Sequence, residues 1–206
     1  SRRRRWCSSN VRPEGGKQHN VRPARARVFF ALWPAPEAAR QLSVVADSFA
    51  NSAGGWATRQ ETIHLTLAFI GDVPLERLPD LQRAARDVSA ETFELTLDQF
   101  GIWRHNRIFW AGCSVLPPAL AMLSTSLKTA LLAADFSVAN AQRTFTPHFT
   151  LVRKVAVLDA ILPVCKPVAW RCEKFVLVRS TLSADGSSYQ TVAEFPLAGS
   201  EGSDIR

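Results

Sequence analysis

The chain has 206 residues with a formal net charge of +7, and 47% of the residues are apolar. This length and composition fit one globular unit, or two tightly joined lobes, with a substantial core, and no apolar run reaches the ~18 residues that a membrane-spanning helix needs. Residues 1–27 contain nine Lys or Arg and one acid, a net of +8, so residues 28–206 carry −1. The basic character therefore belongs to the N-terminal segment, and the folded part is almost neutral.

Residues 1–26 are expected to form a disordered basic tail, because their few apolar side chains cannot offset the entropy of ordering the chain. Residues 199–206 are expected to be a flexible C-terminal tail. The residues after Arg5 are polar, so no export signal is expected and we expect a cytoplasmic protein. The basic tail is either a solvated extension, the simpler interpretation, or an electrostatic arm for RNA phosphates; deleting residues 1–24 and measuring the salt dependence of RNA affinity distinguishes the two.

The folded part begins with an apolar run, Val28–Trp33, which predicts a strand covered on both faces. Glu37–Ala50 has the spacing of a helix with one apolar stripe. A run of β-forming residues, Thr62–Ile70, then predicts a strand that contains the first histidine of interest. A second helix is expected from Pro74 to about Ala90, followed by a strand over Thr92–Leu97, where polar and apolar residues alternate.

The same layout recurs in the second half of the chain. A predicted strand, Arg107–Gly112, is followed by a helix from Pro117 to about Ala134 and by a second strand of β-forming residues, His148–Val152. The interval from strand to histidine is 64 − 28 = 36 residues in the first half and 148 − 108 = 40 in the second, which indicates a duplicated strand-helix-strand unit. The remaining expected elements are a short helical turn near Leu158–Ile161 and two strands, Lys174–Leu182 and Tyr189–Phe195, joined by a hairpin at Asp185-Gly186.

Each of the two central histidines opens a His-x-Thr-x tetrapeptide, His64-Leu65-Thr66-Leu67 and His148-Phe149-Thr150-Leu151. Strand side chains alternate between faces, so the His and the Thr share one face while the residues between them point into the core. One strand histidine alone is more often structural; two, each followed by Thr in matching halves, indicate a catalytic pair. The Cα atoms of His and Thr are about 6.5 to 7 Å apart, so the ring and the hydroxyl can contact one small group between them. A phosphate contacted by both His-Thr pairs is the natural candidate.

Thr66, Thr150 and Arg153 are the predicted phosphate-binding partners of these histidines. The threonines could reflect β-propensity alone, and their assignment depends on the face that they share with the histidines. Arg153 is expected on the face of Thr150 if the strand continues, where its guanidinium would bind a phosphate; otherwise it is a solvated strand end.

Other chemistries have less support. The sequence has no Gly-rich phosphate loop and no Ser in a G-x-S-x-G turn. No carboxylate or Cys shares the histidine faces to complete a metal site, so neither a metal nor a cofactor is expected. His19 in the tail, and His105 and Asn106 in a turn, are assigned no function.

The four cysteines do not change this interpretation. They lack C-x-x-C spacing, and Cys113 is expected to behave as a small apolar residue of a core strand. A disulfide between Cys165 and Cys172 is possible across a hairpin, but a cytoplasmic protein keeps its thiols reduced.

With these residues identified, the sequence resembles the two-histidine (2H) phosphoesterases, and among them the bacterial RNA 2',3'-cyclic phosphodiesterases of the LigT/ThpR type. The resemblance spans residues 27–197, and residues 27–198 are the expected domain. It implies an α+β, bilobal fold with two pseudo-symmetric lobes of mainly antiparallel sheet, helices outside and a central cleft. Ile63 and Thr62 depart mildly from the family pattern without affecting the catalytic positions. The segments that carry the resemblance are Arg27–Leu32, Thr62–Gly71, Arg143–Arg153 and Ser180–Tyr189.

The resemblance further implies metal-independent hydrolysis of terminal 2',3'-cyclic phosphates of RNA, or of cyclic nucleotides, to 2'-phosphomonoesters. By likeness to the family, His64 is the acid that protonates O3' and His148 is the base that acts on water, while Thr66, Thr150 and Arg153 bind the phosphoryl oxygens. The near-symmetry of the site leaves the order of the two histidines open from sequence. The reverse reaction would join RNA through a 2'-5' bond. We expect a monomer.

Two alternatives remain open at the level of sequence. The same site could belong to a 2'-5' oligonucleotide phosphodiesterase or a 3'-end-trimming exonuclease, which product analysis on short oligonucleotides would reveal. A non-enzymatic alternative is an RNA-binding module that uses the basic tail and exposed aromatic side chains, although such a module would hold phosphate better with arginines than with two imidazoles.

Overall fold

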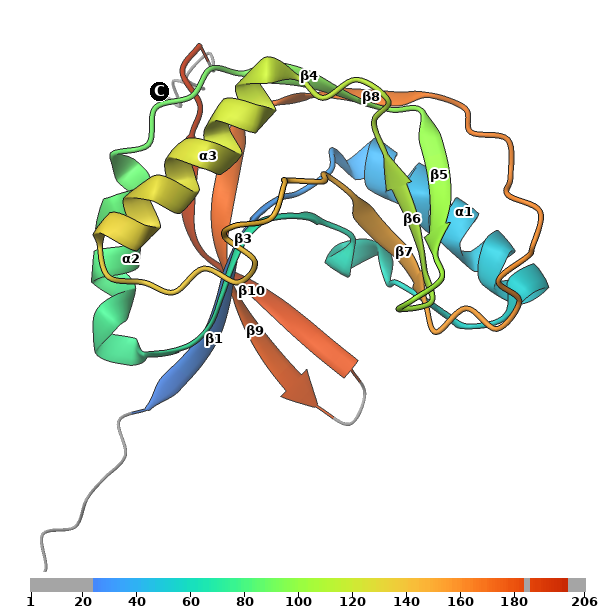
Figure 1. Ribbon diagram of the computed structural model, residues 1–206, viewed down its shortest axis with the longest axis horizontal. Coiled ribbons are helices and arrows are strands. Elements are labelled where there is room, and N and C mark those ends of the chain that lie inside the picture. Colours follow the sequence, from blue (N-terminus) through green and yellow to red (C-terminus); the bar gives the residue numbers. More distant parts are fainter. Residues whose placement is uncertain (1–23, 184–185, 200–206) are drawn as a thin grey trace, which may run out of the picture.

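The computed structural model describes residues 24–183 and 186–199, which form two lobes (Figure 1). Residues 1–23 and 200–206 of the two expected tails lie outside the described residues, as do Ala184 and, from the expected hairpin, Asp185. The first strand begins at Arg25, so the last two residues assigned to the tail belong to the sheet. None of the described helices has the length and apolar character needed to cross a bilayer.

The first lobe is built on an antiparallel sheet of four strands in the order β10-β9-β1-β3. Its central strand β1 is buried from Val28 to Leu32, which confirms the expectation that this apolar run is covered on both faces. Phe30, Phe175 and Phe195 pack together behind the sheet. The strands are β1 (Arg25–Leu32), β3 (Leu65–Pro74), β9 (Lys174–Ser183) and β10 (Gly186–Pro196).

The second lobe continues the same sheet through β7, β6 and β5, with the short β2 also paired to β7. Its core contains a stacked pair of rings, Phe49 and Phe109, with centroids 3.9 Å apart. A separate two-stranded ribbon of β4 and β8 runs across the top of the view in Figure 1. The strands are β2 (Trp56–Ala57), β5 (Gln99–Trp103), β6 (Ile108–Gly112), β7 (Phe149–Arg153), β4 (Phe93–Leu97) and β8 (Val168–Cys172).

The helices lie outside the sheet, and the helix of each duplicated strand-helix-strand unit crosses to the other lobe (Figure 1). Helix α1 (Pro36–Ala53) follows β1 but packs mainly on β7 and β2, whereas α3 (Pro118–Ala133) follows β6 but packs on β3 and on α2 (Leu78–Arg86). Each histidine strand is therefore supported by the helix of the opposite half, which couples the two halves into one folding unit.

A pseudo-twofold relation connects the two lobes at the contact between β3 and β7. The single residue pair that joins these antiparallel strands is Leu65 with Phe149, and each of these residues directly follows one of the two histidines. A local twofold axis therefore passes between equivalent positions of the duplicated unit, which confirms the expected pseudo-symmetric lobes.

The sequence-based element boundaries needed several corrections. Strand β3 continues to Pro74 because its pairing with β1 extends to Arg25, so the second helix begins later, after a 3₁₀ turn at Leu75–Arg77, and ends at Arg86. Thr62 closes another 3₁₀ turn, Gln60–Thr62, rather than lying in a strand. The expected helical turn near Leu158–Ile161 is only a hydrogen-bonded turn, and β5 and β8 were not anticipated.

Candidate active site

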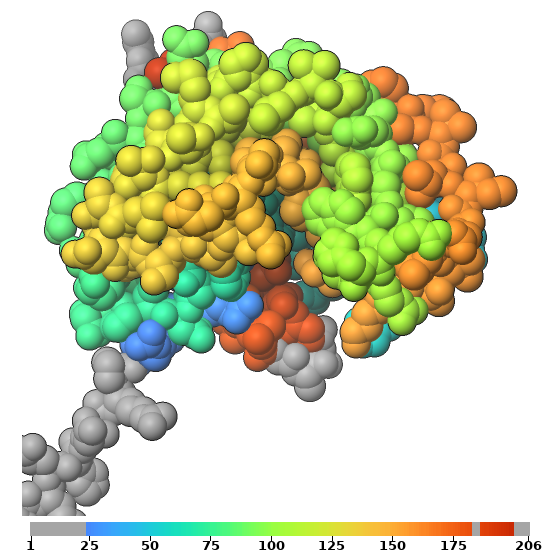
Figure 2. Space-filling view, in the orientation of Figure 1, coloured from blue at the N-terminus to red at the C-terminus, as the bar shows by residue number. Residues whose placement is uncertain are grey.

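A cleft of about 570 Å³ lies between the lobes and is lined by all five predicted site residues. Figure 2 shows the surface hollowed between the segment around α3 and the loop that follows it, in yellow and orange, and the β5–β6 hairpin, in green. His64 and Thr66 reach the cleft from β3 and the residue before it, while His148, Thr150 and Arg153 reach it from β7 and the residue before it. The expectation that both histidine faces open onto one central space is met.

Each of the two imidazole rings is fixed by a hydrogen bond to the backbone carbonyl two residues before it. His64 Nδ1 lies 2.7 Å from the carbonyl oxygen of Thr62, and His148 Nδ1 lies 2.9 Å from that of Thr146. A carbonyl oxygen can only accept a hydrogen bond, so Nδ1 carries the proton and donates in both rings. The hydrogen bond thus sets the tautomer and leaves Nε2 of each ring as the nitrogen that can take or give a proton.

The alternation within each tetrapeptide is as predicted. Leu65 and Phe149, which stand between His and Thr, are at most 1% exposed, whereas Thr66 and Thr150 are partly accessible and line the cleft. Each hydroxyl therefore faces the same space as the histidine that precedes it by two residues.

Arg153 reaches the cleft because of a β-bulge. In a regular strand, a residue three positions after Thr150 lies on the opposite face. The expectation that a regular strand would bring Arg153 into the site is therefore wrong. The register of β7 against β6 shifts between Thr150 and Val152, leaving Leu151 without a partner. The extra residue returns the side chain of Arg153 to the face of Thr150.

The same bulge occurs at the equivalent place in the first half. In β3 the register against β1 shifts so that Leu67 has no partner, since Thr66 pairs with Ala31 and Ala68 with Phe30. Phe69, five residues after His64, then faces the cleft as Arg153 does five residues after His148. The backbone repeats through the bulge, but an aromatic ring occupies one equivalent position and a guanidinium the other.

His64 lies among aromatic rings from strands far apart in the sequence. Its ring centroid is 4.8 Å from that of Phe29, 5.6 Å from Trp33 and 5.3 Å from Tyr189. This burial is the main reason that the pKa of His64 falls from 6.5 to about 4; the bond to Thr62 opposes the change, and the charges of Arg153 and His148 add to it. His64 is therefore neutral in the empty cleft at neutral pH.

His148 has a more open environment. Its ring meets Trp103 edge to face at 4.4 Å, and Trp103 in turn packs on Trp110. Gly101 makes this arrangement possible, because a Cβ at that position would lie 2.3 Å from the Trp110 ring. Burial also lowers the pKa of His148, opposed by the bond to the Thr146 carbonyl and assisted by Arg153.

Several cleft residues had no predicted role. His105 and Asn106, set aside as turn residues, line the cleft at the tip of the β5–β6 hairpin. Phe69 lies five residues after His64, as Arg153 lies five residues after His148, and this repeated spacing could have indicated it. The other side chains come from elements whose positions no local pattern reveals. The further cleft residues without a predicted role include Trp103, Lys128, Arg143 and Phe145.

The chain is similar to known phosphodiesterases over most of its length. The family model described as LigT like Phosphoesterase matches residues 32–110. An RNA 2',3'-cyclic phosphodiesterase of Thermus thermophilus is 30% identical over 186 residues, covering 85% of this chain and 92% of the relative. The chain belongs to the LigT-like phosphoesterase family.

Two further comparisons agree with this membership. The RNA 2',3'-cyclic phosphodiesterase of Escherichia coli is 28% identical over 171 residues, 83% of this chain and 96% of the relative. The crystal structure of E. coli LigT complexed with 3'-AMP superposes with a TM-score of 0.78 at 27% identity, covering 85% of this chain and 99% of that one. The LigT-like fold expected from the sequence is thus confirmed.

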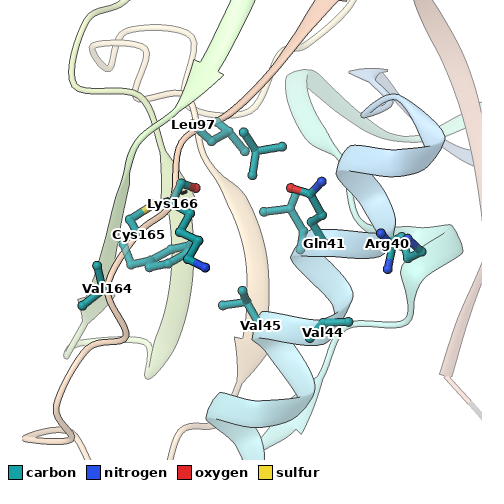
Figure 3. Close-up of a pocket in the computed structure, with 11 residues that line it drawn as sticks. Arg40, Gln41, Val44, Val45, Leu97, Val164, Cys165 and Lys166 are labelled. Atoms are coloured by element: carbon teal, nitrogen blue, oxygen red, sulfur yellow. Dashed lines mark hydrogen bonds between the residues drawn. The ribbon is translucent and has the colours of Figure 1, made fainter.

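A second cavity in this LigT-like phosphoesterase has a different character. The groove, about 510 Å³, lies between α1 and the segment 164–168, and its lining is mainly apolar. Figure 3 shows Gln41 and Val45 of α1 facing Cys165 and Lys166 across it. The groove is lined by no histidine and no carboxylate, so it lacks the imidazole pair found in the cleft.

The thiols and potential metal ligands of the described residues were also located. Cys113, Cys165 and Cys172 are free thiols, and the buried one is Cys172 rather than Cys113. Burial raises the pKa of Cys172 to about 12, which keeps that thiol protonated and unreactive. Across residues 24–183 and 186–199, no three His, Cys, Asp or Glu side chains are grouped as a metal site would require.

Proposed function

We propose that this protein is an RNA 2',3'-cyclic phosphodiesterase that opens terminal 2',3'-cyclic phosphates to 2'-phosphomonoesters by two-histidine acid-base catalysis. The observation that carries the proposal is the pair of imidazoles, each with Nδ1 bonded to the carbonyl two residues before it, facing one cleft with the threonines and Arg153. The named relatives are RNA 2',3'-cyclic phosphodiesterases, and the E. coli LigT structure is a complex with 3'-AMP, a ribose phosphate.

The chemistry needs one proton acceptor and one proton donor. Nε2 of His148 takes a proton from water as the water oxygen attacks phosphorus, and Nε2 of His64 gives its proton to O3' as the bond from phosphorus to O3' breaks. The product is a 2'-phosphate with a free 3'-hydroxyl, and a proton exchange with solvent resets both rings. Each transfer is worth typically 10² to 10⁴ in rate.

The lowered pKa of His64 must be overcome by the substrate. His64 is neutral in the empty cleft, whereas the acid must carry a proton. A cyclic phosphate brings one negative charge. At about 4 Å and an effective dielectric constant of about 20, that charge contributes about 4 kcal/mol, or roughly a thousandfold in a protonation equilibrium. Substrate binding therefore charges the acid when it is required.

Thr66, Thr150 and Arg153 act on the non-bridging oxygens. The two hydroxyls donate hydrogen bonds to these oxygens as negative charge accumulates in the transition state, and the guanidinium adds a full positive charge. Arg153 lowers the pKa of both histidines, so its charge acts on both centres and on the phosphoryl group that would lie between them.

The proposal is tested with 2',3'-cyclic mononucleotides and cyclic-ended oligonucleotides, with phosphorus NMR to identify the product. Wild-type protein should give the 2'-phosphate, His64→Ala and His148→Ala should each lose the activity with an unchanged circular dichroism spectrum, and EDTA should have no effect. Full activity in either variant refutes the mechanism. Shortening of the oligonucleotide chain would instead indicate an end-trimming exonuclease, and a 2'-5' joined product from ends with a free 5'-hydroxyl would show that the reaction runs backwards.

A further inference from the structure

The cleft carries more positive charge than a cyclic mononucleotide requires. Its lining includes Lys128, Arg143 and Arg153 but no Asp or Glu. None of the three cations takes part in a salt bridge within the described part of the chain. A 2',3'-cyclic nucleotide with a free 5'-hydroxyl has one negative charge, and Arg153 already matches it. The other two cations have no counter-charge in the cleft.

Lys128 lines the same cleft as the two histidines. Its ammonium lies over the ring of Phe145, 5.3 Å from the centroid. The next residue along the chain is Thr146, whose carbonyl oxygen binds the ring of His148. The cation thus lies against the residue next to the one that orients the proposed base, on the same wall of the cleft.

Arg143 lies in the loop between α3 and β7, which forms that wall. The loop is attached to β3 through the Ala139 N–H, which donates to the carbonyl oxygen of Phe69 at 2.8 Å, and it ends at His148. A hydrogen bond from the Arg143 N–H to the carbonyl oxygen of Asn140, 2.9 Å, closes a turn within it. The Arg143 side chain is exposed and lines the same cleft as Lys128.

The geometry points to a second phosphate subsite, formed by Lys128 and Arg143, that binds the phosphodiester on the 5' side of the terminal nucleotide. The inference rests on the proposed function and adds a preference: cyclic ends of oligonucleotides are favoured over cyclic mononucleotides. Phosphate contacts from Lys and Arg position a nucleic acid without reading its sequence, so the preference is independent of the base.

The experiment compares kcat/KM for three substrates: adenosine 2',3'-cyclic phosphate, the ApA dinucleotide with the same cyclic end, and that dinucleotide with an uncharged methylphosphonate linkage. We expect the charged dinucleotide to exceed the mononucleotide by about tenfold or more, the lower range for a charged hydrogen bond, and the uncharged one to lose that gain. The charged dinucleotide should also show a salt dependence steeper by about 0.7 in slope for each phosphate contact.

Variants assign the gain to the two side chains. Lys128→Met, which keeps an apolar chain against Phe145, and Arg143→Met should each reduce the ratio of charged dinucleotide to mononucleotide several-fold, and Lys128→Arg should restore it. Lys166→Met removes one positive charge from the other groove and is the matched control, with an unchanged ratio.

The outcomes separate this inference from the proposed function. Absence of any hydrolysis of the mononucleotide by wild-type protein would refute the proposed function itself. Hydrolysis of the mononucleotide with no advantage for the charged dinucleotide overturns the subsite alone. An advantage that survives in both Met variants, or with the methylphosphonate, also overturns it, because the gain would then come from the second base. A 5'-phosphorylated cyclic mononucleotide that gains as much as the dinucleotide, and loses the gain in Lys128→Met, supports a subsite for any phosphate on O5'.

Discussion

The two histidine centres share one backbone design and differ in what surrounds it. Each ring is held by the carbonyl of the residue two positions earlier, each is followed by an inward residue and a threonine, and each strand then bulges at a leucine, Leu67 or Leu151. The pair that joins β3 to β7 is formed by the residues next to the histidines. A duplicated backbone thus places two imidazoles in equivalent positions, and for the proposed proton transfers the backbone alone would make them interchangeable.

The surroundings remove that interchangeability. Three aromatic rings lie around His64, whereas the described contacts of His148 include the ring of Trp103 and an exposed Thr146. Beyond the bulges, Phe69 faces the cleft in one half and Arg153 in the other. Since an acid and a base need different proton affinities, the asymmetric side chains allow two equivalent positions to perform different roles.

The largest expected effect separates those roles by changing the leaving group. In a cyclic nucleotide with sulfur in place of O3', the leaving group is a thiolate, which needs little help from an acid. His64→Ala should lose about 10² to 10⁴ in rate on the normal substrate and recover most of that loss on the sulfur analogue. His148→Ala should be impaired by a similar factor on both substrates, as measured by steady-state hydrolysis rates.

The reciprocal result is equally informative. If His148→Ala were rescued by sulfur and His64→Ala were not, the acid and base would be exchanged, in line with the lower proton affinity of His64 in the empty cleft. Rescue of neither variant would show that departure of O3' is not assisted by either ring.

The second-largest effect is expected at Arg153 and Phe69, which occupy equivalent positions after the two bulges. Arg153→Met should lower kcat/KM by about 10- to 100-fold, the range for a hydrogen bond to a charged group, and Arg153→Lys should recover part of it without the bidentate geometry. Phe69→Leu, at the equivalent position, should have a smaller effect. Because Arg153 lowers the pKa of both histidines, NMR titration of Arg153→Met should show both pKa values raised; a change at only one ring would contradict its central position.

Much of the fold could be predicted from local patterns. The apolar run of β1 and the stripe of α1 were recognised because each element buries the side chains that its period dictates. Strand β5 was missed because Gly101 interrupts its pattern, and that glycine is explained only by the Trp110 ring that lies against it. Strand β8 is short and pairs only with β4, so little of its sequence is constrained by burial.

The residues that meet in the cleft were also predictable, but their surroundings were not. His and Thr two residues apart indicate a shared face whatever the rest of the chain does. The bulge that brings Arg153 into the cleft has no local signal, because Leu151 looks like any inward residue. The rings around His64 come from β1, from the residue after it and from β10, and only the folded sheet brings Tyr189 near His64.

A moderate effect is expected in the pH dependence. The base must be neutral, and because its pKa is lowered, kcat/KM should be lost on the acid side only below pH 6.5. The acid must be protonated, and with a pKa of about 4 in the free protein its charged fraction falls as pH rises above that value. The optimum of kcat/KM should therefore lie below pH 6.5. The optimum of kcat should lie at higher pH, because the bound phosphate favours the protonated ring of His64. Coinciding optima would contradict charging of the acid by substrate.

The smallest effect comes from the aromatic surroundings and is measured in the free protein. Tyr189→Leu removes one ring beside His64 and lessens its desolvation, so its pKa should rise from about 4 towards 6.5, while the hydrolysis rate changes only a few-fold. Trp103→Leu is the matched control, because it should raise the pKa of His148 instead. Imidazole NMR titrations report both values, and a Tyr189→Leu variant that changed the two rings equally would contradict separate environments.

The same lowered pKa links His64 to acid stability, and the sign follows from proton counting. The unfolded chain binds a proton at His64 near pH 6.5 and the folded chain only near pH 4, so the free energy of unfolding falls as pH decreases through this interval. Tyr189→Leu should flatten that decrease in urea titrations between pH 7 and 4, even though the lost ring makes the variant less stable at pH 7. A decrease as steep as in wild type would mean that other groups, and not the buried ring, set the acid limit of the fold.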